Sequence, residues 1–269
     1  MKRFLGFVPV VWLWIAAMAL FTFQSCKKTS PDTSPDIKPK LRILVPLYSY
    51  PTDDNGQIWK SAAAAADKIP LSVIWGMIGD TGQTEIEFYR QWLDTLRKGR
   101  RMELLAYVAT TDGNRPIDSV KALIDYYVMH FDIDGIFLDE VNGSPSRYAH
   151  YRAIVQYVKR FQALKKVILN APYASSELVD STGADAVLFY ENEWEYWDVF
   201  DWEDYQALDR ENKAALVSDV FSEENMKRVL DEALARDFGY IYVTDTTYDY
   251  LPSYWNEEVN YVKQINENP

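Results

Sequence analysis

The amino-acid sequence predicts a single (β/α)8 TIM barrel of the α/β class, preceded by an export segment and a short tether. Three observations lead to this prediction. The chain has 269 residues, and one such barrel takes about 250. Short apolar runs with strand character alternate with amphipathic stretches, which is the pattern of βα units and a parallel sheet. Eight strands can be counted, each followed by a helix or a connection that can replace one.

The first four βα units are marked by clear start and stop signals. Five consecutive alanines lie in the first helix, Gly99 stops the second, and Pro116 opens the third, where proline is accepted in the first turn. The predicted strands are 41–48, 71–78, 104–109 and 135–138, and the helices that follow them are 57–68, 85–98, 116–130 and 148–164.

The last four units are shorter but keep the alternation. An acidic, aromatic stretch at 193–208 takes the place of a regular helix after the sixth strand, and 223–236 is the most clearly amphipathic helix of the chain. The predicted strands are 167–170, 186–190, 214–217 and 240–243, and the other helices are 175–181 and 254–265.

A doubly wound open sheet is the alternative to the barrel. It would need a glycine-rich first turn to hold a nucleotide phosphate. The chain reads YSYPTDDNG after its first strand, which contains neither GxGxxG nor a P-loop lysine. We therefore favour the barrel and expect it to span residues 41–269.

The N-terminus has the layout of a secretory signal. Lys2 and Arg3 precede an apolar run at 4–23, and the segment ends at Cys26 after a small residue. We expect a lipoprotein-type signal peptide at 1–25, lipidation at Cys26, and a flexible tether at 26–40 that is rich in proline, serine and charge. Ordinary cleavage that leaves a free thiol, or an uncleaved anchor helix, is the alternative. All three export the domain, so we expect a bacterial protein held at a membrane, in the periplasm or at the cell surface.

The composition restricts the class of partner. The chain has 40 acidic and 28 basic residues and a net charge of -12, which would repel a phosphate backbone. Nucleic acid is therefore excluded as an expected partner. The single cysteine, Cys26, allows no intramolecular disulfide. We expect a monomer.

Acidic and polar side chains follow the predicted strands, where the active sites of such barrels lie. The fourth strand, in the stretch DGIFLDEV, delivers Asp139 and Glu140 at its end, and the sixth ends at Glu191. One of the adjacent pair should enter the mouth, and both can do so only if the chain turns there. Two carboxylates across a mouth are what glycoside hydrolysis requires. The alternative is that these acids have structural roles. Asp139 or Glu140 could cap a helix or pair with a nearby arginine, and Glu191 could lie in a solvated loop.

Other strand-end residues are candidate sugar contacts, or residues that fix their own loops. They are Tyr48, Tyr107, Asn170, Tyr190 and Asp245. The two histidines, His130 and His150, fall on predicted helices, far from the strand ends. We therefore expect no metal site, no cofactor and no histidine-based catalytic triad, although a carboxylate-only calcium or magnesium site stays open.

Several spaced motifs resemble the spherulin-4-like (spherulation-specific family 4) proteins. They are VPLYSYP at 45–51, AYV at 106–108, NRP at 114–116 and DGIFLDEV at 134–141. The family includes secreted galactosaminogalactan hydrolases and is related to endo-α-1,4-galactosaminidases. The resemblance implies a (β/α)8 barrel that cleaves α-1,4-linked amino sugars. It matches the family's acidic pair to Asp139 and Glu140 and a later acid to Glu191. The chain departs from the family pattern after the second strand, where it reads WGMIGDTG at 75–82.

These observations predict a hydrolase of an amino-sugar-containing exopolysaccharide or surface glycan. We expect Asp139 or Glu140 to act as the general acid, with the other and Glu191 as nucleophile, base or electrostatic stabiliser. A non-catalytic glycan-binding lipoprotein on the same barrel is the first alternative. An enzyme with another substrate, such as a metal-dependent deacetylase, is the second.

Overall fold

The computed structural model describes residues 40–76, 83–98 and 102–267. The expected signal peptide, Cys26 and almost all of the expected tether lie outside these residues, as do residues 77–82 of the loop after the second strand. Among the helices of the described residues, none is both long and apolar enough to cross a membrane.

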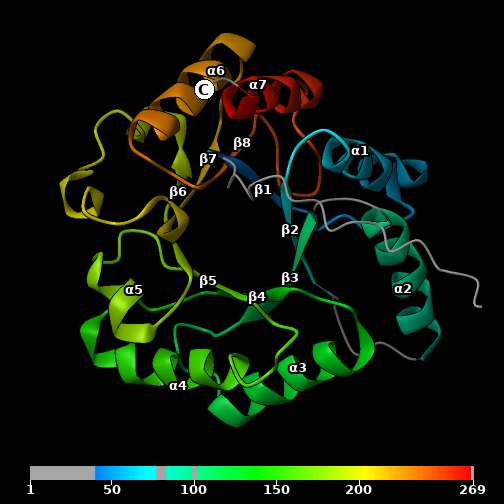
Figure 1. Cartoon of the computed structure of the whole chain (residues 1–269), viewed down its shortest axis with the longest axis vertical. Helices are drawn as coiled ribbons and strands as arrows, with labels where there is room; N and C mark the ends of the chain where they lie inside the picture. Colours follow the sequence, from blue (N-terminus) through cyan, green and yellow to red (C-terminus); the bar gives the residue numbers. More distant parts are fainter. Residues whose placement is uncertain (1–39, 77–82, 99–101, 268–269) are drawn as a thin grey trace, which may run out of the picture. The chain divides into compact units, whose positions relative to one another are not determined.

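Eight parallel strands form a closed barrel in sequence order, which confirms the predicted fold (Figure 1). Closure is made where β1 pairs with β8, with Arg42 opposite Tyr240 and Ile43 opposite Ile241. The strands are β1 Arg42–Pro46, β2 Leu71–Trp75, β3 Met102–Ala109, β4 Gly135–Asp139, β5 Lys166–Asn170, β6 Ala186–Glu193, β7 Lys213–Ser218 and β8 Tyr240–Val243.

Seven α-helices lie outside the barrel strands in the described part of the chain (Figure 1). They are α1 Gln57–Ala66, α2 Gln83–Arg97, α3 Ile117–His130, α4 Tyr148–Val158, α5 Glu177–Thr182, α6 Glu223–Ala235 and α7 Trp255–Glu267. Two short 3-10 turns, η1 Asp53–Gly56 and η2 Pro145–Arg147, lead into α1 and α4. Between β6 and β7 the chain forms three further 3-10 turns instead of a helix: η3 Trp194–Tyr196, η4 Glu203–Tyr205 and η5 Arg210–Asn212.

Helices α6 and α1 pack on the barrel through buried faces that their sequences specify. In α6, Met226, Val229, Leu230 and Ala233 are buried at helical spacing, so one face packs inward. The side chain of Ser222 caps this helix by accepting a hydrogen bond from the backbone N of Asn225 at 3.2 Å. In α1, four of the five alanines are buried, because only a small side chain permits close approach of that helix.

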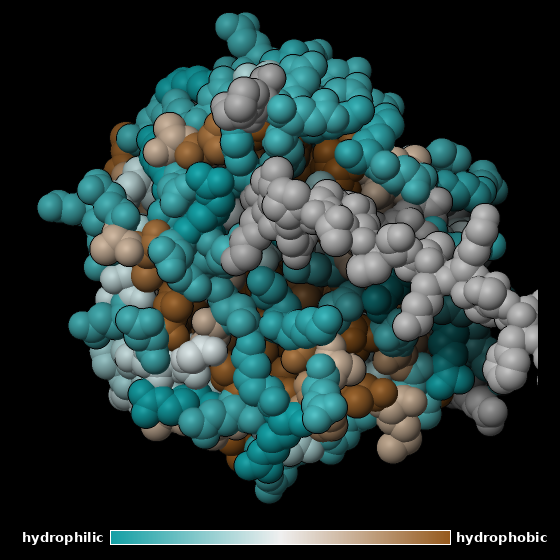
Figure 2. All heavy atoms as spheres, in the orientation of Figure 1, coloured by the Kyte–Doolittle hydropathy of each residue, from teal (hydrophilic) through white to brown (hydrophobic). Residues whose placement is uncertain are grey.

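Residues of the strands form a large part of the hydrophobic core. Every residue of β2 and β8 is buried, as expected for strands covered on both faces. Gly135 opens β4 against its neighbour, and a Cβ there would meet the carbonyl oxygen of Lys166 at 2.3 Å. The glycine of the DGIFLDEV stretch is thus required by close packing. On the face shown in Figure 2, hydrophilic residues predominate, and hydrophobic ones show between them.

Glu258, on α7, is a fully buried carboxyl group under β8. Its Oε1 accepts a hydrogen bond from the backbone N of Val243 at 3.2 Å, and its Oε2 has no partner. Burial, opposed by that hydrogen bond, raises the pKa of Glu258 well above its usual value of 4.5. The folded protein therefore keeps this proton to a higher pH than the unfolded chain does.

We predict that Glu258→Gln stabilises the protein at neutral pH and not at acid pH. The stability contributed by protonated Glu258 is fully present below pH 4.5 and is lost as the pH rises through the folded pKa. Between pH 4.5 and the folded pKa, the free energy of unfolding of the variant should rise relative to that of the wild type by up to about 1.4 kcal/mol per pH unit. Denaturant unfolding from pH 4 to 8 measures this, with exposed Glu257→Gln as control. A difference that does not change with pH contradicts the prediction.

Candidate active site

Three neighbouring strands bring two carboxylates together at the carboxyl end of the barrel. Asp139 ends β4, Asn170 ends β5, and Glu191 lies in the last part of β6. The Nδ2 of Asn170 donates to Asp139 Oδ1 at 2.7 Å and to Glu191 Oε2 at 2.6 Å. The amide therefore bridges the two acids, and the predicted convergence of strand ends is seen here.

Tyrosines from both sides complete the hydrogen bonding of this pair. The hydroxyl of Tyr107, from β3, donates to the second oxygen of Asp139 at 2.6 Å. Tyr248, in the loop after β8, forms a hydrogen bond with Glu191. The ring of Tyr48 packs edge-on against both tyrosines, with centroids 5.7 Å from Tyr107 and 6.5 Å from Tyr248.

The surroundings of Glu191 change the acidity of its carboxyl group. Burial raises the pKa of Glu191, and the negative charge of Asp139 adds to this rise. The hydrogen bonds from Asn170 and Tyr248 oppose it, but the net direction is upward. A carboxyl group held in this way keeps its proton to a higher pH than an exposed glutamate, which suits a proton donor.

Glu140 is separated from Asp139 by a sharp turn of the backbone. It has a φ of 54° and is exposed, and its Oε2 accepts a hydrogen bond from the backbone N of Thr111 at 2.9 Å. It is near enough to Tyr107 to contribute to the raised pKa of that hydroxyl. The carboxylate of Glu140, which follows β4, thus lies at the rim of the site, against the loop that follows β3.

Two of the predicted sugar contacts have structural partners of their own. Tyr190 is fully buried, its hydroxyl donates to the carbonyl of Glu193 at 2.6 Å, and its ring packs on Trp197 and Trp202. Neighbouring strand residues face opposite ways, so Glu191 cannot reach the mouth while Tyr190 does.

The second of these residues is Asp245. Its carboxylate accepts hydrogen bonds from the backbone N and the hydroxyl of Ser253. It therefore fixes the loop after β8, which is the structural alternative to sugar contact. Tyr48, Tyr107 and Asn170 do lie at the carboxylate pair.

The sequence interpretation missed Tyr248, which contacts Glu191. This residue is three positions beyond Asp245, in a loop whose direction no local pattern indicates. The only available signal was that an aromatic residue with a hydroxyl group follows the last strand on the side where the acids converge.

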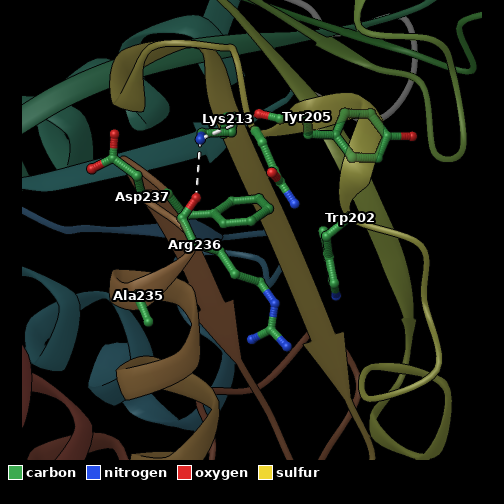
Figure 3. A pocket seen from close by; sticks show the side chains of 8 residues that line it. Trp202, Tyr205, Lys213, Ala235, Arg236 and Asp237 are labelled. Carbon is green, nitrogen blue, oxygen red and sulfur yellow. Dashed lines mark hydrogen bonds between the residues drawn. The ribbon is translucent and has the colours of Figure 1, made fainter.

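A cavity lies away from the carboxylate pair. It has a volume of about 510 Å³ and is lined by residues that include Trp202, Lys213, Arg236 and Asp237 (Figure 3). Lys213 opens β7, so this cavity lies near the amino ends of the strands, opposite the carboxylate pair. The Nζ of Lys213 donates to the carbonyl of Arg236 at 3.0 Å, so this buried cation has a structural partner.

Among the described residues, no group of three or more histidine, cysteine and acidic side chains could hold a metal ion. Three oxygens of the carboxylate pair accept hydrogen bonds from the amide of Asn170 and the hydroxyl of Tyr107.

Fold and site together define a (β/α)8-barrel protein with a bridged carboxylate pair at the carboxyl ends of its strands. The chain belongs to spherulation-specific family 4 (Spherulin4), whose model matches residues 42–262. The match spans nearly the whole barrel and confirms the resemblance seen in the sequence motifs. No curated protein sequence matches the chain.

Solved structures share the barrel. Sph3 of Aspergillus clavatus, crystallised in complex with GalNAc, is similar with a TM-score of 0.72 at 19% identity over 84% of this chain and 98% of that chain. Methylaspartate ammonia lyase of Clostridium tetanomorphum is similar with a TM-score of 0.52 at 8% identity, over 86% of this chain and 58% of that chain. At these identities the likeness shows the fold alone.

We predict opposite changes in the pKa of Glu191 in two variants. Asn170→Ala removes a hydrogen bond that lowers this pKa, so the pKa should rise. Asp139→Asn removes a negative charge that raises it, so the pKa should fall. Carbon-13 NMR titration of labelled glutamate carboxyls measures both. Asp245→Asn, an acid at the same end of the barrel, is the control and should leave Glu191 unchanged. Shifts of the same sign in the two variants would contradict the bridged arrangement.

Proposed function

We propose that this protein is a glycoside hydrolase that cleaves an amino-sugar-containing polysaccharide, of the α-1,4-galactosamine type, in an exopolysaccharide or surface glycan. The observation that carries the proposal is the bridge from Asn170 to Asp139 and Glu191. Burial raises the pKa of Glu191, and a pair of carboxyl groups that includes a proton donor is the apparatus that glycosidases use.

Glu191 serves as the general acid in this proposal. Its raised pKa keeps the proton available for the leaving glycosidic oxygen. Asp139 serves as the nucleophile, because Tyr107 and Asn170 donate to its two oxygens and fix the direction of the carboxylate. Glu140, at the rim, stabilises positive charge that develops on the sugar.

In the first step Asp139 bonds to the anomeric carbon, the glycosidic bond breaks, and the leaving oxygen takes the proton of Glu191. In the second step ionised Glu191 takes a proton from water, whose oxygen displaces Asp139 and frees the sugar. The enzyme returns to its starting protonation state.

We propose that the configuration is retained. Asp139 Oδ1 and Glu191 Oε2 bond to one nitrogen, at 2.7 and 2.6 Å, so these two oxygens are at most about 5.3 Å apart. A close pair of carboxyl groups is typical of retaining enzymes, in which the two groups lie about 5–5.5 Å apart.

Two findings support an amino sugar as substrate. The chain belongs to the Spherulin4 family, and its structural neighbour Sph3 was crystallised with GalNAc. The net charge of -12 favours a neutral or cationic glycan over an anionic one.

We predict that the wild type releases reducing ends from partly deacetylated α-1,4-galactosamine polymers. Asp139→Asn and Glu191→Gln should each lower kcat by about 10²–10⁴-fold, because each removes a group required in the transition state. Glu140→Gln should have a smaller effect. Exposed Glu257→Gln is the control and should retain full activity. Proton NMR of the first product should show the configuration of the substrate.

Other outcomes would separate the alternatives. Glycan binding without release of reducing ends across a panel of exopolysaccharides would favour a non-catalytic glycan-binding protein. Release of acetate that is lost on chelation would favour a metal-dependent deacetylase.

We also propose that the barrel is exported and held at a bacterial membrane through a lipid on Cys26. The support is the order of a basic start, an apolar run at 4–23 and a cysteine after a small residue. Substitution Cys26→Ser in a bacterial host should abolish incorporation of labelled palmitate and release the protein from the membrane fraction. Cys26→Ser protein that stays fully in the membrane without label would favour an uncleaved anchor helix.

A further inference from the structure

Lys213 is a buried cation whose neighbours bind it without balancing its charge. It opens β7, and only 2% of its surface is exposed. Its Nζ donates to the carbonyl oxygens of Arg236 at 3.0 Å and Tyr205 at 3.4 Å, and both acceptors are neutral. An ammonium group has three donor hydrogens, so one remains for a further partner.

The charged groups around Lys213 do not compensate for its burial. Within the described residues, no ion pair includes this lysine. Burial lowers its pKa, and the charge of Arg210 adds to this effect, whereas Asp237 and Asp209 oppose it. The net direction is downward. A buried charge is costly unless it is paired, so a counter-ion beside this group would be favourable.

A cavity of about 510 Å³ lies beside Lys213 (Figure 3). Volumes of about 300–1,000 Å³ are usual for small-ligand sites. The cavity lies near the amino ends of the strands, so a ligand in it does not meet the carboxylates of Asp139 and Glu191. Its lining comes from the β6–β7 connection, the start of β7 and the segment before β8, and includes Trp202, Tyr205, Gln206, Lys213, Arg236, Asp237 and Phe238.

Contacts within the protein hold the aromatic walls of this cavity in place. The indole Nε1 of Trp202 donates to the carbonyl of Trp197 at 3.3 Å. The hydroxyl of Tyr205 donates to the carbonyl of Ala174 at 2.9 Å. The guanidinium of Arg236 lies 5.4 Å from the centre of the Trp202 ring. A ligand would therefore find a largely preformed surface, which reduces the entropic cost of binding.

The other two charged residues of the lining already have partners. Asp237 accepts a hydrogen bond from the Nε of Arg210 at 2.7 Å. Arg236 forms an ion pair with Glu232 at 3.1 Å. These two pairs cancel, so the ammonium of Lys213 leaves one net positive charge at the cavity.

We propose that this cavity is a binding site for a small organic carboxylate with a flat apolar body, whose carboxylate accepts a hydrogen bond from Lys213. A single negative charge matches the single uncompensated positive charge, whereas a doubly charged phosphate would exceed it. The rings of Trp202, Tyr205 and Phe238 provide apolar and aromatic contacts for a flat body. This site is separate from the carboxylate pair and does not depend on the proposed hydrolase function.

The test compares probes of similar shape and different charge by calorimetry on the wild-type protein. Benzoate, benzamide and benzylamine carry a negative, a neutral and a positive group on one ring, and acetate and inorganic phosphate lack the ring. We expect benzoate to bind about tenfold more tightly than benzamide or acetate, because a charge-assisted hydrogen bond and the ring both contribute. Benzylamine should not bind. The net charge of -12 works against unspecific binding of benzoate.

Three results would overturn the proposal. Equal affinity for benzoate and benzamide, or no benzoate binding, would remove the role of the ammonium group. Equal affinity for acetate and benzoate would remove the role of the rings. Tighter binding of phosphate than of benzoate would replace the carboxylate by another class of anion.

The place of binding is read in the wild type by NMR of nitrogen-15-labelled tryptophan. Benzoate should shift the indole signal of Trp202 and leave that of Trp59, on α1, unchanged. Benzoate binding without a shift at Trp202 would place the ligand elsewhere and contradict the proposal. This measurement requires no variant and no glycan turnover.

A matched pair of variants tests the ammonium group directly. Lys213→Gln removes the charge but keeps a donor for the carbonyl of Arg236, and it should weaken benzoate binding about tenfold while benzamide binding stays nearly the same. Lys227→Gln is the control, because this lysine lies on α6, is exposed and pairs with Glu223. Folded Lys213→Gln protein that binds benzoate as the wild type does would overturn the site.

Discussion

The side-chain amide of Asn170 is the interaction on which the site depends. Two carboxylates at close range repel each other, and only a neutral group with two donor hydrogens can hold both without adding charge. The Nδ2 of Asn170 does so from the end of β5, between the strands that carry Asp139 and Glu191. Its own Oδ1 is buried without a partner, so the donor hydrogens alone orient the amide. The parallel register sets this geometry, because Leu138 lies opposite Leu169 and Asn170 lies opposite Leu188.

Sequence reasoning reached the fold and most of the site because both follow from regular strands. A parallel barrel brings all strand ends to one face, so Asp139, Asn170 and Glu191 could be grouped without coordinates. The sequence does not indicate side-chain positions where the chain leaves regular strand geometry. Tyr190 is a predicted sugar contact, but it adjoins Glu191, and adjacent strand residues face apart. Tyr248 lies in a loop, and loops have no periodicity from which a direction can be inferred.

Backbone strain is concentrated where the site is. Of the eight non-glycine residues with positive φ in the described ranges, all but Asp237 lie on loops at the carboxyl end of the barrel. Such conformations persist only when the surroundings impose them. Here the strands are short and almost fully buried, so a rigid core imposes the loop conformations. Glu140 illustrates this, since its turn directs its carboxylate to Thr111 rather than to the side of Asp139.

The connection between β6 and β7 has a further consequence. It covers the barrel with 3-10 turns and an aromatic cluster in which Trp197, Trp202 and Tyr205 pack on strand residues. No long helix there has to be preserved in length or register. Insertions and deletions can therefore accumulate in this segment without loss of barrel closure. Asp139, Asn170 and Glu191 all precede this stretch, so a change in its length leaves the strands that carry the bridged carboxylates intact.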